Sequence, residues 1–514
     1  MNLLDQLISV ISPEAGFRRA SARLALAENK RYAAANISRS RGDWFASKAG
    51  ENATLAKTIP ETRARATQQV RDNPLALRMV DLWVLHIIGD GMKTRFMPQG
   101  GVSTRTARKQ NEVFNAWAES TYCDAEGLNN IYGLHANACW ILVEKGEVFL
   151  RKMVMPSNHP LAKKTPLRLQ VMVLEPEFLD HGKNGTNTEE GPGFGNPISM
   201  GIEFDKNFPT VRVAYWMFPE HPGENPKVST NLRSVRVPAG EIAHVFMKTR
   251  NNIRGVTWLH AALETLKDLD DYLAALKMKA KIEACFTILI QQTANSQSAP
   301  IAGRSQRQEE DVEEIAPGLV RRLKPGEDAK AFDPGNSSGH SALLQTFIRM
   351  AAIAAGLTYD QAYSDLTGAN YSSLRAGKME FNRSVSRRQW VFEQMAVQPI
   401  CQWFAEIGYA SGLWSSPDFV ANVSPAPSDF VDPKKDGDAE KQEVEMGFAT
   451  WSKKVADRGT DPETHTAELE AEFKLFEKMG VEHPFKKAMS MVGTKPAATA
   501  TVAKPDDEDE KEAA

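Results

Sequence analysis

Two helical segments separated by a short polar break constrain this chain more than any other feature. Residues 340–357 are mainly apolar, and a second helical segment is expected over residues 374–414. Between them, residues 358–373 carry short polar side chains and Gly368, which favour a tightly turned loop. Pro399 should kink the second helix, because proline donates no backbone hydrogen bond and clashes with the preceding turn. Two long helices joined by a polar loop are therefore expected at the centre of the fold.

The ends of these helices carry recognisable signals. Gly356 is expected to end the first helix, and Ser372 or Ser373 to cap the second. A further long helix is expected from about Thr257 to Ile290, where it would reach roughly 50 Å at ~1.5 Å per residue. Helices of that length are unusual in a compact domain, and they suit the wall of a larger assembly.

The region before these helices mixes helices and strands. A helix capped by Asn73 starts at Pro74, and alternating apolar residues predict strands near residues 147–155 and 242–246, with others between them. A glycine-rich stretch at 184–197 lacks the strand-to-helix setting of a phosphate-binding loop and is interpreted as a solvent loop. The sequence therefore predicts the α+β class.

Composition excludes several classes of protein. The formal net charge of -3 argues against a simple protein that grips DNA by its phosphates. The four cysteines are far apart and form no Cys-x-x-Cys pair, so neither zinc nor a disulfide framework is expected. No apolar run reaches the ~18 residues of a membrane span.

No catalytic signature emerges. The match Gly335-Asn-Ser-Ser-Gly339 to a nucleophile elbow lacks the preceding apolar strand. Asp268, Asp270 and Asp271 are interpreted as partners of nearby lysines on the long helix, not as metal ligands. We therefore expect neither enzymatic activity nor a cofactor.

Three stretches of the central helices carry a family resemblance. Ala354-Ala-Gly-Leu-Thr-Tyr-Asp-Gln361, Asn370-Tyr-Ser-Ser-Leu-Arg-Ala-Gly377 and Arg387-Arg-Gln-Trp-Val-Phe392 resemble the portal proteins of tailed phages of the lambda type. The resemblance extends over most of residues 70–410. It implies a subunit of a ring, usually dodecameric, that sits at one capsid vertex and lets DNA pass through its centre.

The resemblance also divides the chain into parts with expected roles. We expect a basic N-terminal arm at 1–70, an α+β wing at 71–254, a first stem helix at 255–290, a clip at 291–338, a second stem helix at 339–357, a tunnel loop at 358–373, a long kinked helix at 374–414, a connector and helical C-terminal crown at 415–492, and a disordered acidic tail at 493–514.

Three groups of residues are candidates for function. The tunnel loop should face DNA without gripping it through Asp360, Ser364, Asp365, Thr367, Gly368, Asn370 and Ser372. A basic face of the following helix should meet either DNA phosphates or carboxylates of the next subunit through Arg375, Lys378, Arg383 and Arg387. The clip offers a solvated face or a docking site for the packaging motor at Glu309, Glu310, Glu313 and Glu314.

Two functions are consistent with these features. The first is a structural ring in the virion, assembled in the host cytoplasm, whose implied partners are the large terminase subunit, the major capsid or scaffolding protein, a head-tail joining protein and double-stranded DNA bound without sequence specificity. The second is a DNA-binding or DNA-processing protein that acts as a monomer or small oligomer. The mass of the purified particle separates the two.

Overall fold

The computed structural model describes residues 14, 47–98, 104–165, 167–224, 232–285, 289–292, 327–330, 340–365, 371–427, 430 and 432–485. Contacts divide the chain into two units, Met1–Thr54 and Leu55–Ala514. The second unit holds the described strands and helices, except that α3 begins at Glu51, within the last residues of the first unit, and that residue 14 lies in the first unit. The expected clip carboxylates and acidic tail lie outside the described residues, as does almost all of the basic arm before residue 47.

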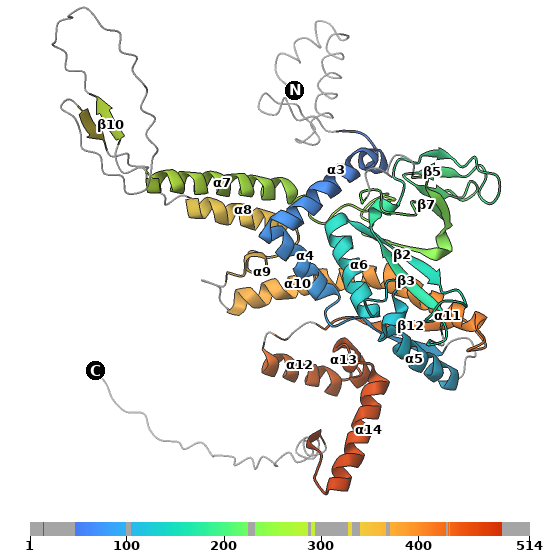
Figure 1. The fold of residues 1–514 in the computed structure, drawn as a ribbon. Coiled ribbons are helices and arrows are strands. Elements are labelled where there is room, and N and C mark those ends of the chain that lie inside the picture. Colours follow the sequence, from blue (N-terminus) through green and yellow to red (C-terminus); the bar gives the residue numbers. More distant parts are fainter. Residues whose placement is uncertain are drawn as a thin grey trace, which may run out of the picture. The chain divides into compact units, whose positions relative to one another are not determined.

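Helices form most of the described chain, and they mix with short antiparallel strands, so the predicted α+β class is confirmed (Figure 1). The helices are α3 Glu51–Asp72, α4 Pro74–Ile87, α5 Thr104–Ala118, α6 Ile131–Lys145, α7 Leu263–Cys285, α8 His340–Ala354, α9 Tyr359–Tyr363, α10 Tyr371–Phe392, α11 Gln398–Ala410, α12 Pro433–Glu445, α13 Trp451–Asp457 and α14 Pro462–Met479, with a π-helix η8 at Glu393–Val397 and 3-10 helices η3 Thr121–Cys123, η4 Pro176–Phe178 and η6 Ala239–Glu241. Among the described residues, no helix is both long enough and apolar enough to span a membrane.

The strands build four small sheets in the described part of the chain. Their bounds are β1 Lys93–Pro98, β2 Glu147–Val154, β3 Leu169–Leu174, β4 Gly185–Thr186, β5 Pro197–Ser199, β6 Ile202–Phe204, β7 Arg212–Met217, β8 Val235–Pro238, β9 Ile242–Phe246, β10 Leu289–Gln292, β11 Glu327–Lys330 and β12 Phe419–Ser424. The sheets have the orders β3-β2-β9, β4-β5-β6-β7-β8, β1-β12 and β10-β11. In the first, β2 is central, and Phe149 pairs with Leu174 on one side and His244 on the other.

The pairing of β1 with β12 corrects the expected connector. Phe96 lies opposite Ala421, and its ring stacks on Phe404 with centroids 5.4 Å apart. Residues 415–492 were expected to form a connector and a helical crown, but residues 419–424 form a strand that pairs with β1. Alternating burial of Ala421 and Val423 explains why this strand forms against the core.

The N-terminal arm also needs correction, because its last part is the long helix α3. Leu55, Ile59, Ala66 and Val70 are buried along one face of this helix, together with the charged residue Arg63. Helical spacing of three and four residues puts all five on one stripe. The residues from Glu51 onward therefore form a folded helix, and its stripe from Leu55 onward is part of the main unit's core.

The first stem helix is shorter than predicted. α7 begins at Leu263, because the chain before it is tied to other elements: Trp258 N donates to Val143 O at 3.1 Å, and Gly255 N donates to Glu147 at 2.7 Å. Its C-terminal bound is Cys285, and residues 289–292 form β10 instead of continuing the helix. α7 packs side by side with α8, as Figure 1 shows.

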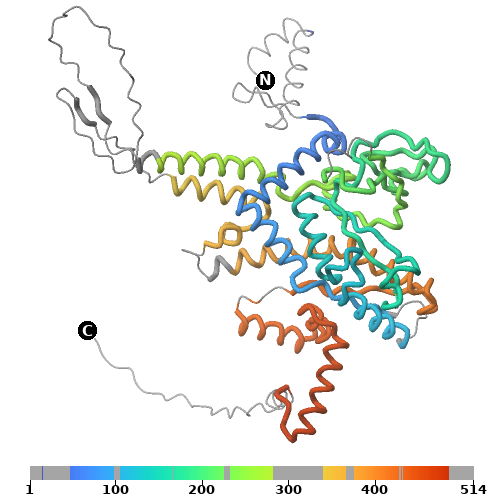
Figure 2. The backbone as a smooth tube through the Cα atoms, viewed as in Figure 1, coloured from blue at the N-terminus to red at the C-terminus, as the bar shows by residue number. Residues whose placement is uncertain are grey.

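Near Pro399, where a kink was predicted, the structure has a π-helical segment. α10 continues through η8 into α11, and Pro399 occupies the first turn of α11, where its missing N–H is tolerated (Figure 2). α10 starts at Tyr371, three residues earlier than predicted, so Ser372 lies inside the helix and does not cap it. The regular α-helix is therefore interrupted close to Pro399, while the start of the helix was predicted too late.

The sequence also predicts two C-terminal helices, one over residues 440–455 and one from about Pro462 to Met479, and the structure agrees with them in part. α14 has the predicted bounds, Pro462–Met479, with Asp461 as its N-cap and Gly480 in the left-handed region after its last turn. A single helix expected over residues 440–455 is instead divided between α12 and α13. Gly447, at φ +75°, makes the turn between them.

Candidate functional site

The candidate site is the segment that joins α8 to α10. Gly356 adopts φ +76° after α8, and Leu357 N donates to Ala352 O at 2.9 Å, which closes the helix end as predicted. Thr358 and Gln361 then form a capping box that starts α9. The expected loop at 358–373 is thus helical at both ends, over Tyr359–Tyr363 and from Tyr371 onward, because Thr358 and Gln361 supply a start signal that the turn-rich composition obscured.

The structure places four of the seven predicted loop residues. Asp360 lies in the first turn of α9, while Ser364 and Asp365 follow its end, with Ser364 exposed and at φ +57°. The Tyr359 hydroxyl donates to Asp365 Oδ2 at 3.4 Å. Of the other predicted loop residues, Ser372 lies in the first turn of α10, and the rest lie outside the described residues: Thr367, Gly368 and Asn370.

Two tyrosines hold α9 together. The rings of Tyr359 and Tyr363 stack with centroids 5.6 Å apart, and the Arg349 guanidinium of α8 lies 5.2 Å from the Tyr359 ring. Tyr363 remains 53% exposed. Tyr359 therefore packs against α8, whereas Tyr363 lies outside the core.

The four cations of the predicted basic face of α10 differ in their contacts. Arg375 Nη2 forms an ion pair with Asp436 of α12 at 2.8 Å, within the same chain. Lys378, Arg383 and Arg387 form no ion pair with any described residue, and Arg383 and Arg387 are exposed. The predicted face is thus present on one helix, and one of its four cations binds a carboxylate of the C-terminal helices.

Arg388 points to the opposite side of α10, into an aromatic junction. Its guanidinium lies 4.0 Å from the Trp83 ring and 5.0 Å from the Trp258 ring. Burial, together with the neighbouring charge of Arg387, lowers the pKa of Arg388 to about 10. Trp83 Nε1 donates to Ala355 O at 3.0 Å. This junction fixes α10 and the end of α8 to α4 and to the segment that leads into α7.

A buried carboxylate, that of Glu147, links elements far apart in the chain, and only a run of strand residues marks its position in the sequence. Glu147 Oε1 accepts from Arg254 Nε and from Arg63 Nη2, both at 2.7 Å, and Oε2 accepts from Gly255 N at 2.7 Å. His244 Nε2 lies 3.0 Å from Oε2. This cluster, called the Glu147 node below, joins α3, β2, β9 and the chain that enters α7.

The electrostatics of the Glu147 node favour the charged carboxylate. Burial alone would raise the pKa of Glu147, but the guanidinium groups of Arg254 and Arg63 outweigh it and hold that pKa well below its usual range. Burial lowers the pKa of His244 to about 4, so the ring is neutral near pH 7 and donates from Nε2. The node is a fully desolvated ion cluster with a structural role.

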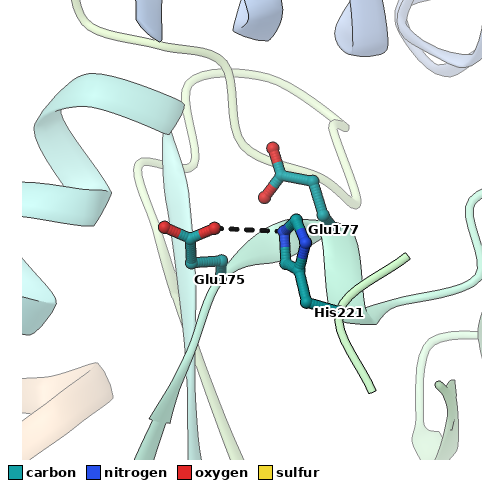
Figure 3. Close-up of side chains that lie close together, drawn as sticks. All are labelled: Glu175, Glu177 and His221. Atoms are coloured by element: carbon teal, nitrogen blue, oxygen red, sulfur yellow. Dashed lines mark ion pairs between the residues drawn. The ribbon is translucent and has the colours of Figure 1, made fainter. Parts of the chain in front are cut away.

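A second acidic cluster has the composition of a metal site. Glu175, Glu177 and His221 each offer a ligand atom within 4.8 Å of the others (Figure 3). Lys145 Nζ already binds Glu175 at 2.8 Å and Glu177 at 3.2 Å. Gly223 N donates to His221 Nδ1 at 3.1 Å, so the ring proton is on Nε2, the atom that faces Glu175 at 3.2 Å. With Nε2 protonated and a lysine between the carboxylates, the donor set does not fit a metal ion.

The glycine-rich stretch at 184–197 is mostly exposed, as its interpretation as a solvent loop requires, but it is also anchored to the body. Asn196 Nδ2 donates to Glu203 Oε1 at 2.8 Å, and Arg236 binds the same fully buried carboxylate with Nε and Nη2. Gly193, at φ +88°, passes so close that an added Cβ would lie 2.1 Å from Glu203 Oε1. Because glycine has no Cβ, the backbone at Gly193 can approach the buried Glu203 side chain this closely.

The family model and the curated relatives agree on one family. The family model described as "Phage portal protein, lambda family" matches residues 38–389. The probable portal protein of Halomonas phage phiHAP-1 is 27% identical over 470 residues, covering 88% of this chain and 86% of that protein. Portal protein B of Escherichia phage lambda is 24% identical over 461 residues, covering 80% and 83%. A chain from the neck of an empty GTA particle superposes with a TM-score of 0.44 at 14% identity, covering 81% of this chain and 95% of that one.

Proposed function

Because the chain belongs to the lambda family of phage portal proteins, we propose that it forms a ring at one capsid vertex through which double-stranded DNA is packaged and ejected. The observation that carries this proposal is the family match over residues 38–389. That range contains the Glu147 node, the helix pair α7–α8 and almost all of α10. The elements that would build a ring wall are therefore those that the family model describes.

The α8–α10 segment is the proposed channel lining. Asp360, Ser364 and Asp365 are short and polar, so they offer water and weak repulsion to a polyanion instead of a grip. The aromatic junction at Trp83 supports this role, because it anchors both flanking helices to the body while α9 lies between them. Such a segment can line a conduit without retaining the duplex.

The proposed partners follow from the same role. The ring is a homo-oligomer, proposed to be dodecameric, in the virion, and it assembles in the host cytoplasm. The clip, residues 291–338, is proposed to dock the large terminase subunit, which would supply the energy for DNA movement. The wing is proposed to meet the major capsid or scaffolding protein, and a head-tail joining protein binds after packaging. The subunit itself is proposed to act structurally and not as an enzyme.

A lysine substitution in the lining tests the channel. Asp365→Lys with Asn370→Lys should leave ring assembly intact but make the duplex adhere, because each lysine adds a phosphate contact with strong salt dependence. We expect packaging to slow by roughly tenfold at low salt and to recover as salt rises. The measurement is the rate of DNA packaging into empty capsids across salt concentrations.

A matched control places the same charge change elsewhere. Asp457→Lys in α13 with Asn115→Lys in α5 adds the same charge at two positions outside the proposed lining. This control should package at the normal rate. Normal packaging by the loop variant at every salt concentration would show that the α8–α10 segment does not face the duplex.

A further inference from the structure

One face of α10 carries an exposed stripe that nothing in the described chain covers. Met379 is 56% exposed and Trp390 is 61% exposed, and the exposed residues Arg383 and Arg387 lie between them. The spacing of four, four and three residues puts all four side chains on one side of a helix. Methionine, arginine and tryptophan are the residues that interfaces between proteins favour. This set is called the α10 stripe below.

The charge of the α10 stripe is not balanced by the described residues. Arg383 and Arg387 form no ion pair with a described carboxylate, whereas the two neighbouring arginines of the helix are occupied: Arg375 by Asp436 and Arg388 by the tryptophan junction. Arg387 also stands beside the buried charge of Arg388 and lowers its pKa. A carboxylate-bearing surface would therefore relieve repulsion as well as pair two cations.

The first half of α7 presents a complementary surface. Glu264 and Asp268 are exposed, and neither forms an ion pair with a described cation; Lys267 on the same helix pairs with Asp271 at 2.5 Å. Glu264 and Asp268 are four residues apart, as are Arg383 and Arg387. Each pair thus spans about 6 Å along its helix, so two helices lying side by side can match both charges.

We propose that the α10 stripe of one subunit docks on the acidic face of α7, around Glu264 and Asp268, of a second copy of this chain. The inference rests on the proposed ring, and it names the contact that repeats around it. Two different patches on one subunit are what a closed ring of identical chains requires. The stripe is therefore one side of a heterologous interface, and α7 supplies the other.

Duplex DNA is the less suitable occupant of the α10 stripe. Phosphates would pair with the arginines, but a duplex offers no exposed base face on which Trp390 could stack, and Met379 would stay in water. A protein surface can cover both apolar side chains and pair both charges. The two apolar residues therefore decide between the alternatives.

Charge reversal with complementation tests the contact. Arg383→Glu with Arg387→Glu, and separately Glu264→Lys with Asp268→Lys, should each lower the ring fraction by about tenfold, because like charges then face each other. Mixing the two variants should restore rings, since the reversed α10 stripe of one matches the reversed α7 face of the other. Ring fraction is measured by sedimentation velocity at equal total protein, and circular dichroism melting confirms that each variant is folded.

The control carries the same number of reversed charges on exposed arginines elsewhere. Arg65→Glu with Arg78→Glu alters α3 and α4, and it should form rings like the unaltered chain. If both test variants assemble as well as this control, the inference is wrong while the proposed ring stands. Rings of the Arg383/Arg387 variant that form normally but retain less DNA would assign the stripe to the channel, and that also overturns the inference. If the unaltered chain forms no rings, the proposed function itself is contradicted, and the inference that rests on it falls with it.

Discussion

Replacing Glu147 by glutamine is expected to lower the free energy of unfolding by roughly 3–5 kcal/mol, the cost of leaving buried charges without their counter-ion. Glutamine keeps the shape of the side chain but removes its charge. Arg254 is fully buried and Arg63 is 5% exposed, so water cannot replace the lost partner. Because the node joins α3, β2, β9 and the entry to α7, the damage should extend across the main unit.

The measurement is a urea titration of the variant beside the unaltered chain. Glu61→Gln is the matched control, since Glu61 pairs with Arg65 at 2.9 Å on the exposed side of α3. An exposed pair of this kind contributes about 0.5 kcal/mol or less, so the control should be nearly neutral. A loss below about 1 kcal/mol for Glu147→Gln would show that the two arginines find other partners, and the node would not have the role assigned to it.

Gly146→Ala should destabilise the same region through the backbone, by about 3 kcal/mol when strain and overpacking are combined. Gly146 follows α6 at φ +89°, where a side chain is strained. A Cβ there would lie 2.1 Å from the carbonyl carbon of Val256 and 2.3 Å from Thr257 N. These atoms cannot withdraw freely, because the adjacent Gly255 N and Trp258 N are both hydrogen-bonded to this corner.

The matched control for that substitution is a glycine with open space. Gly437 lies inside α12, and no atom lies within 4 Å of the position its Cβ would take. Alanine there should stabilise the helix by about 0.5–1 kcal/mol. Thermal melting of both variants, followed by circular dichroism, should move in opposite directions. An unchanged melting temperature for Gly146→Ala would mean that this corner can open, contrary to the packing described.

Elements with local start and stop signals were predictable from the sequence. α14 is bounded by Asp461, Pro462 and Gly480, and its predicted ends match the structure. β9 has the predicted bounds as well, because Ile242–Phe246 is a short apolar run between a turn and a polar segment. In these cases neighbouring residues alone decide where the element begins and ends.

Elements decided by distant contacts were not predictable. β12 forms only because β1, far earlier in the chain, pairs with it. The buried stripe of α3 includes Arg63. A hydrophobicity pattern treats arginine as an exposed polar residue, and only its contact with the buried Glu147 explains why it lies on the buried face. α7 starts late because Gly255 and Trp258 are held by β2 and α6. Each of these depends on a partner that no local window contains.

In the candidate site, too, local features could be predicted from the sequence and long-range contacts could not. A basic face on α10 follows from helical spacing, and the structure places its residues on one helix. The sequence could not show that Arg375 would pair with Asp436, or that Met379 and Trp390 would be exposed beside the arginines. Nor could composition reveal the Glu147 node, since its members lie in four separate elements.

The mass and shape of the purified particle test the central claim most directly. Light scattering combined with particle imaging should give closed rings with a central hole and a mass that is a fixed multiple of the 56.9 kDa subunit, with a dodecamer as the proposed state. Melting should then depend on protein concentration, because assembly stabilises the folded subunit. A chain that remains monomeric at every concentration, and melts cooperatively at the same temperature throughout, would contradict the account.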